Sequence, residues 1–155
     1  MDYKHYWYYP VIASEDEINN VITEIKKIEK ILNLTMKYKN SDGIVNIEQI
    51  YFDKIDDEDI FNDPFMMNFS KITKNNQCKY CKTNRNPKFD MMVSLILLSM
   101  VNNIKDFYFS SDGDNEDWIK AIKIYKEHIG ELDNAYGKFV FNTLQNISVL
   151  FTKKN

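Results

Sequence analysis

Residues 86–104 read NPKFDMMVSLILLSMVNNI, and this stretch determines the fold. It opens with Asn86, a good N-cap residue, and Pro87, which favours the first position of a helix. From Phe89 onward the residues are apolar almost all round, without the polar face of a surface helix. The run is well short of the ~20 apolar residues that a membrane-spanning helix needs. We therefore predict a central helix that is buried on most of its surface.

Two elements are predicted before this helix. Residues 3–11 are dense in aromatic side chains, which favour strands, and Pro10 closes the run. Ser14 and Glu17 have the spacing of a capping box, in which the two residues satisfy N–H groups at a helix start. Apolar residues then recur every three or four positions, as in an amphipathic helix: Ile18, Val21, Ile22, Ile25, Ile28 and Leu32.

The segment between these two helices predicts short strands. Residues 35–39 and 44–52 have strand composition, and the turn residues 41–43 between them indicate a hairpin. Residues 53–63 carry six acidic side chains and indicate an acidic loop or a short turn of helix. We expect a short strand at residues 65–72 and a polar loop at residues 73–82.

After the central helix, residues 107–109 predict a short interior strand that the polar residues 110–113 interrupt. Asp114 or Asn115 then caps an amphipathic helix that ends at Gly130. Residues 132–151 repeat apolar side chains at helical spacing and predict a last helix. The order β-α-β-β-β-α-β-α-α gives one α+β domain, with a mixed or antiparallel sheet of about four to five strands and helices on one face.

Composition limits the classes of function. The chain has 155 residues, 20 basic against 23 acidic side chains and a net charge of −3, which argues against binding duplex nucleic acid through its phosphates but permits a small anionic ligand. The start of the chain lacks the pattern of a signal peptide, so we expect a cytoplasmic protein. Cys78 and Cys81 form a lone C-x-x-C without a second pair, which favours two reduced thiols over a zinc site. We predict no metal and no other cofactor.

The first candidate site surrounds Arg85, the only arginine in the chain. Arg85 lies just before the central helix, where N–H groups and the helix dipole favour an anion. Lys82 adds a second positive charge and Thr83 a hydroxyl, so this segment has the composition of a phosphate cradle. Alternatively, Arg85 pairs with an acidic side chain such as Asp90 or Asp112 and holds the loop in place.

The second candidate site is the turn at Ser110, Ser111 and Asp112, between a predicted strand and a helix. Loops of this kind often form ligand crevices, and Asp112 can accept hydrogen bonds from ribose hydroxyls. It can also bind a metal or act as a base. The common structural use of such a turn is to cap the next helix. Neither serine has an obvious histidine partner, so we do not expect a nucleophilic serine.

The third candidate site is the aromatic strand. Alternation places Tyr6 and Tyr8 on one face and His5 and Trp7 on the other, so one face can enter the core while the other stacks on a flat ring. A base stacked on Trp7 or Tyr9 would complete a nucleotide site. A core strand with some exposed tyrosines explains the same pattern.

Two motifs resemble those of a family of small uncharacterised bacterial and phage proteins. Residues 81–90 contain a C-K-T-x-R-x-P segment that ends in Phe89-Asp90, where the family has Tyr-Asp. Residues 110–118 read SSDGDNEDW and match S-S-D-G-D-x-x-D-W, and His5-Tyr6-Trp7 matches an H-Y-W near the family's start. The resemblance spans about residues 3–130, so residues 1–130 would form the core and 131–155 a C-terminal helical addition. The resemblance implies that these motif residues are candidate site residues, but it implies no mechanism.

The leading hypothesis is a binding protein for a small anionic ligand, a nucleotide or a nucleotide-derived signal. Lys82, Thr83 and Arg85 would hold phosphate, Asp112 with Ser110 or Ser111 would take hydroxyls, and Trp7 or Tyr6 would stack. In a phage, such a protein would act as a counter-defence sponge that sequesters an immune nucleotide.

Two other hypotheses stay open. One is a hydrolase or transferase for a phosphorylated substrate, with Asp112 or His5 as general acid or base. The other is an immunity or inhibitor module that uses the acidic segment, with Asp56, Asp57 and Asp59, against a basic partner. The apolar C-terminal segment is also compatible with a homo-oligomer.

Overall fold

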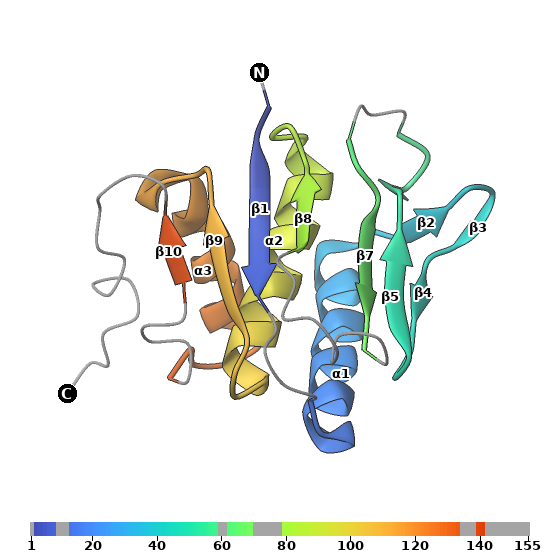
Figure 1. Ribbon diagram of the computed structural model, residues 1–155. Coiled ribbons are helices and arrows are strands. Elements are labelled where there is room, and N and C mark those ends of the chain that lie inside the picture. Colours follow the sequence, from blue (N-terminus) through green and yellow to red (C-terminus); the bar gives the residue numbers. More distant parts are fainter. Residues whose placement is uncertain (1, 9–12, 59–61, 70–78, 134–138, 142–155) are drawn as a thin grey trace.

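The computed structural model describes residues 2–8, 13–58, 62–69, 79–133 and 139–141 (Figure 1). Within these residues the chain forms three helices and ten short strands, which confirms the predicted α+β class. The helices are α1 (Glu15–Leu32), α2 (Pro87–Asn103) and α3 (Asn115–His128). The strands are β1 (Lys4–Tyr8), β2 (Met36–Tyr38), β3 (Ser41–Asp42), β4 (Ile44–Val45), β5 (Gln49–Phe52), β6 (Lys54–Ile55), β7 (Phe65–Asn68), β8 (Lys79–Lys82), β9 (Tyr108–Ser111) and β10 (Phe139–Phe141).

The three helices begin where the sequence predicts. Ser14 and Glu17 form the expected capping box of α1, and Asp114 forms a second one with Asp117 at α3. Helix α2 begins at Pro87, although the Asn86 side chain makes no capping hydrogen bond. Its apolar side chains are buried along almost its whole length, because α2 packs between α1 and α3. The prediction of a central buried helix is therefore confirmed, and no helix of the described residues is both long and apolar enough to span a membrane.

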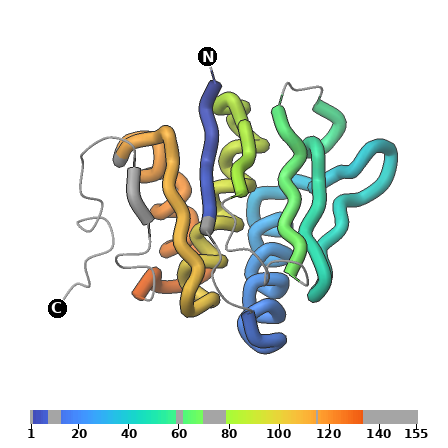
Figure 2. The backbone as a smooth tube through the Cα atoms, viewed as in Figure 1, coloured from blue at the N-terminus to red at the C-terminus, as the bar shows by residue number. Residues whose placement is uncertain are grey.

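The largest sheet has the strand order β10-β9-β1-β8 and is mixed. Strand β1 lies in the middle and pairs antiparallel with β8 and β9, whereas β10 runs parallel to β9. Figure 1 shows α2 and α3 behind this sheet. Strands β8 and β9 end, and β1 begins, at the edge of the sheet where α2 and α3 start (Figure 2). We call this the upper edge, after its place in the figures.

Two smaller sheets, β3-β2-β6 and β4-β5-β7, complete the fold. The predicted hairpin is wrong in its pairing: β2 pairs with β3 around a turn at residues 39–40, and β4 pairs with β5 around residues 46–48. Gly43 was expected in the turn, but it lies between β3 and β4. A side chain at Gly43 would approach the Cβ atoms of Met36 and Phe52 to 3.1 and 3.2 Å, so glycine there permits close packing.

Three further expectations need correction. The acidic segment contains the short strand β6, and the predicted polar loop at residues 73–82 ends in strand β8. Where a last helix was predicted at residues 132–151, residues 139–141 form β10 beside β9. The other residues of that predicted helix, apart from 132–133, lie outside the described part of the chain, as do residues 9–11 of the first predicted strand and 70–72 of the strand at 65–72.

The core joins all three sheets to the helices. Phe52 of β5 lies between Phe65 and Phe89, with ring centroids 5.4 and 5.3 Å away, and so connects β7 to α2. Trp7 of β1 contacts Phe65 at 5.3 Å and extends this aromatic cluster into the main sheet. On the other side, Phe109 and Trp118 pack β9 onto α3. Burial of these large rings, together with the aliphatic side chains of the same core, stabilises the fold.

Candidate functional site

The three candidate segments of the sequence meet at the upper edge of the main sheet. In the register of β1 with its neighbours, Lys4 lies opposite Lys82, and His5 lies opposite Ser111. The turn that carries Arg85 connects β8 to α2, and the turn that carries Asp112 connects β9 to α3. Residues almost 110 positions apart in sequence are therefore neighbours in the sheet.

Beneath this edge runs a chain of buried polar side chains. The Thr83 hydroxyl donates to Oδ1 of Asp90 at 2.5 Å, and the same oxygen lies 2.7 Å from Nε2 of His5. Nδ1 of His5 lies 2.8 Å from the Ser111 hydroxyl. Thr83, His5 and Ser111 are fully buried. The chain connects β8, α2, β1 and β9.

Proton counting limits the hydrogen bonds of Ser111. Oγ of Ser111 accepts from the N–H of Gly113 at 2.9 Å and from Nε1 of Trp118 at 3.1 Å, which uses both of its lone pairs. The single Ser111 proton is then shared between two neighbours, Nδ1 of His5 and the Tyr3 hydroxyl.

The expectation that neither serine has a histidine partner is wrong, because Ser111 has one. The sequence did not reveal the pair, since His5 and Ser111 are 106 positions apart. Ser, His and Asp in a row are also the groups of a catalytic triad. Here, however, Ser111 and His5 have no exposed surface, and both lone pairs of Ser111 are occupied. The arrangement is a structural connection inside the fold, and a substrate has no access to it.

The predicted phosphate cradle is occupied by the protein's own carboxylates. Arg85 forms an ion pair with Asp117, where sequence analysis considered Asp90 or Asp112, and its guanidinium lies 4.2 Å from the ring centre of Tyr3. The Lys82 ammonium lies 3.5 Å from Asp2. Arg85 is 58% exposed at the rim, so an external anion would compete with Asp117 for it.

The turn that carries Arg85 has a strained backbone. Asn84 and Arg85 both have left-handed φ angles, 52° and 59°, which residues other than glycine seldom adopt. The contacts of the guanidinium with Tyr3 and Asp117 hold Arg85 in this conformation. Burial of the Tyr3 hydroxyl, with Asp90 and Asp117 nearby, raises the pKa of Tyr3 above its usual range.

Asp112 has a structural partner in β1. Its Oδ2 accepts from the backbone N–H of Lys4 at 3.0 Å, and its own N–H donates to the Lys4 carbonyl at the same distance. Asp112 therefore extends the pairing of β1 and β9 to the end of the strands. The predicted role of Asp112 toward ribose hydroxyls stays a prediction.

The two faces of β1 differ as alternation predicts, and the face that carries Trp7 is the one that enters the core. His5 and Trp7 face the helices, and Trp7 is only 2% exposed, so Trp7 offers no surface to a base. Tyr6 and Lys4 are half-buried and lie on the opposite face. Tyr9 lies outside the described residues.

On this second face, aromatic and basic side chains come together. The face consists of Lys4 and Tyr6 of β1, Tyr80 and Lys82 of β8, and Tyr108 and Ser110 of β9, and we call it the tyrosine face. Tyr80 and Tyr108 are 55% and 42% exposed. None of the described helices covers it (Figure 1).

Sequence reasoning missed Lys4, Tyr80 and Tyr108 as candidates. Tyr80 was assigned to a polar loop because β8 has only four residues. The alternation in KYCK, with Cys81 buried and Tyr80 exposed, was the available signal.

Other polar clusters serve the fold. Burial raises the pKa of the Cys81 thiol, which lies beneath the sheet and is unsuited to act as a thiolate. In the acidic segment, Asp56 accepts from the N–H of Thr35 at 2.9 Å. Lys88 lies 3.5 and 3.2 Å from carboxylate oxygens of Asp56 and Glu58. Of the described residues, no three His, Cys, Asp or Glu side chains are grouped so that they could hold a metal ion.

Comparison of the chain with protein-family models, with curated proteins and with solved structures found no match, so the resemblance inferred from the two motifs stays a hypothesis.

Proposed function

We propose that the protein is a cytoplasmic binding protein for a nucleotide or a nucleotide-derived anion, and that this ligand binds on the tyrosine face. The observation that carries the proposal is the register of two neighbouring strands. Lys4 lies opposite Lys82 at the upper edge, and Tyr6 lies opposite Tyr80 two residues further along. Two positive charges and two aromatic rings are thereby held side by side on one rigid surface.

The chemistry of these groups matches the two halves of a nucleotide. An exposed tyrosine ring offers a flat face to a base, and stacking of this kind contributes about 1–3 kcal/mol per base. Lysine binds phosphate as a point charge. The ammonium of Lys4 lies 5.0 Å above the centre of the Tyr80 ring, so the ring already accepts a cation on that face. A base that stacks there takes the place of the ammonium, which can then turn to the phosphate.

The experiment is a thermal-shift screen of the purified protein against mono-, di-, cyclic and sugar nucleotides. A ligand at one hundred times its Kd adds about 2.7 kcal/mol of stability. For a chain of this length that corresponds to about 5–10 °C, at roughly 2–4 °C per kcal/mol.

Variants then locate the site. Tyr80→Ala and Lys82→Ala should each reduce the shift of any ligand found. Two matched controls should keep it, because Tyr38 of β2 and Lys123 of α3 lie outside the tyrosine face. A ligand whose shift is the same in all four variants binds elsewhere and overturns the assignment, and a panel without any shift overturns the function.

A further inference from the structure

We infer that the tyrosine face binds single-stranded nucleic acid, over about three nucleotides, in preference to a mononucleotide. This inference rests on the proposed function and specifies its ligand. It comes from the spacing of the exposed rings, because a single base cannot contact all of them.

The spacing follows from the strand register. Tyr80 and Tyr108 lie on β8 and β9, on either side of β1, and adjacent strands are ~4.8 Å apart. Tyr80 is opposite Tyr6, whereas Tyr108 is opposite residue 8, which adds an offset of two residues or ~7 Å along the strands. The Cα atoms of Tyr80 and Tyr108 are therefore ~12 Å apart. That separation is too wide for one base, and the three rings along it, Tyr80, Tyr6 and Tyr108, offer positions for about three bases.

The orientation of the rings also favours successive bases. The ring of Tyr6 lies between the other two positions, with its centroid 6.3 Å from that of Tyr80 and a tilt of 46° between the planes. Rings at this angle cannot clamp one flat base between parallel faces. Each ring instead offers its own plane to a different base, as on other sheet surfaces that bind single strands.

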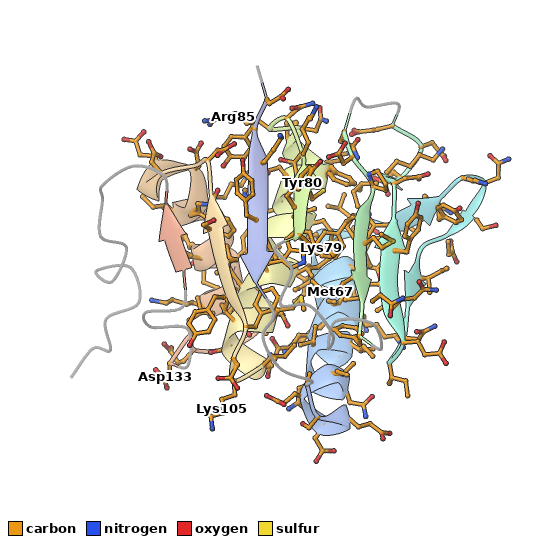
Figure 3. All side chains as sticks on the ribbon, viewed as in Figure 1. Met67, Lys79, Tyr80, Arg85, Lys105 and Asp133 are labelled. Atoms are coloured by element: carbon orange, nitrogen blue, oxygen red, sulfur yellow. The ribbon has the colours of Figure 1, made fainter. Side chains whose placement is uncertain are left out.

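Positive charge lies at the upper end of this path, where Lys4 is opposite Lys82. Lys79, at the other end of β8, is opposite Trp7 and therefore points to the face of the sheet away from Tyr80. Figure 3 shows Arg85 at the upper edge and Tyr80 below it. A bound strand would therefore place a phosphate beside Lys4 and Lys82 and cross the three rings from there.

The charge of the whole chain agrees with a short, unpaired ligand. A net charge of −3 does not favour binding a duplex through many phosphates, and paired bases present no free face to a tyrosine. Acidic groups near this path include Asp2, Asp63 and Asp112 at the upper edge. Because carboxylates repel phosphates, these groups favour a nucleic-acid strand that crosses the tyrosines below that edge.

The test measures binding of fluorescein-labelled oligothymidylates and oligouridylates, from one to about six nucleotides, by fluorescence anisotropy. We expect the Kd to fall at least tenfold between one and about three nucleotides and then to level off. Tyr80→Ala and Tyr108→Ala should each weaken binding of the longer strands roughly 5- to 100-fold. Lys82→Ala should lower the slope of log K against log salt by about 0.7, the value for one phosphate contact of a single strand.

The controls separate this inference from the proposed function. Tyr38→Ala and Lys123→Ala should bind the longer strands like the unmodified protein. If a mononucleotide binds as tightly as a trinucleotide, the inference is wrong and the proposed function stands. If length dependence persists in Tyr80→Ala and Tyr108→Ala, the strand binds elsewhere and the inference is also wrong. If neither nucleotides nor oligonucleotides bind, both proposals fail.

Discussion

Replacement of Ser111 by alanine tests the buried chain directly. The Ser111 hydroxyl also contacts the Tyr3 hydroxyl, and it is the common partner of three nitrogen groups: the N–H of Gly113, Nε1 of Trp118 and Nδ1 of His5. In Ser111→Ala all three lose that partner in a site without exposed surface. Each buried polar group left unsatisfied costs about 1–3 kcal/mol.

The three costs do not add fully, because the groups belong to one network. We therefore expect Ser111→Ala to lower the free energy of unfolding by about 3 kcal/mol. At roughly 2–4 °C per kcal/mol for a chain of this length, Tm should fall by about 6–12 °C. A change of that size distinguishes a buried network from an ordinary surface hydroxyl, whose removal changes stability by less than about 0.5 kcal/mol.

The assay is urea unfolding followed by tryptophan fluorescence, with an unchanged m-value as the check that only the folded state is affected. Ser110→Ala is the matched control, because Ser110 is the adjacent serine and lies half-buried on the opposite face of β9. If Ser111→Ala unfolds within about 0.5 kcal/mol of the Ser110→Ala variant, the hydroxyl is not the common partner, and the assigned network is refuted.

Two other predictions concern a close contact and a half-buried carboxyl group. Gly113→Ala should destabilise the fold because a Cβ there would lie 2.2 Å from the Tyr3 hydroxyl, whereas Gly130→Ala, with nothing within 4 Å, should be neutral. Adding Tyr3→Phe to Gly113→Ala removes the hydroxyl from this contact, so the double variant should regain part of the lost stability. If thermal unfolding gives the same Tm for the double variant and for Gly113→Ala, the contact is not the cause. Burial raises the pKa of Glu29 above 4.5, so its contribution to stability is present at low pH and is lost as the pH rises through the folded-state pKa. Glu29→Gln keeps an acceptor for the N–H of Met36 but carries no charge. It should therefore become more stable relative to the unmodified protein as the pH rises above about 4.5. If urea unfolding shows a difference in stability that does not change with pH, this prediction is wrong.

Local signals in the sequence were sufficient for the three helices that the structure describes. The capping box at Ser14 and the apolar periodicity of α1 are set by residues three or four positions apart, and Pro87 marks the first turn of α2 in the same way. Alternation along β1 likewise predicted that His5 and Trp7 share one face. These patterns depend only on residues close together in the sequence, and the tertiary packing agrees with them.

Pairing between distant segments could not be predicted from local patterns. Strand β8 pairs with β1 more than 70 positions earlier, and its four residues are mostly polar, so composition indicated a loop. The apolar residues of β10 fit a helical period as well as a strand, and only the neighbouring strand β9 decides between them. The turn of the first hairpin lies at Lys39, which adopts a φ of 55° although it is not a glycine. Gly43 instead lies where a side chain would come too close to Met36.

The same alternation separates the residues that stabilise the fold from those of the proposed binding face along one short strand. In β1, His5 and Trp7 point toward the helices and hold the sheet in place, whereas Lys4 and Tyr6 point to the tyrosine face. The hydrogen bonds of His5 connect β1 to β9 and α2, so they hold in place the strand that carries Lys4 and Tyr6 on its other face. A substitution at Tyr6 should therefore weaken binding while the fold stays stable. A substitution at His5 should destabilise the fold first and affect binding only as the sheet loosens.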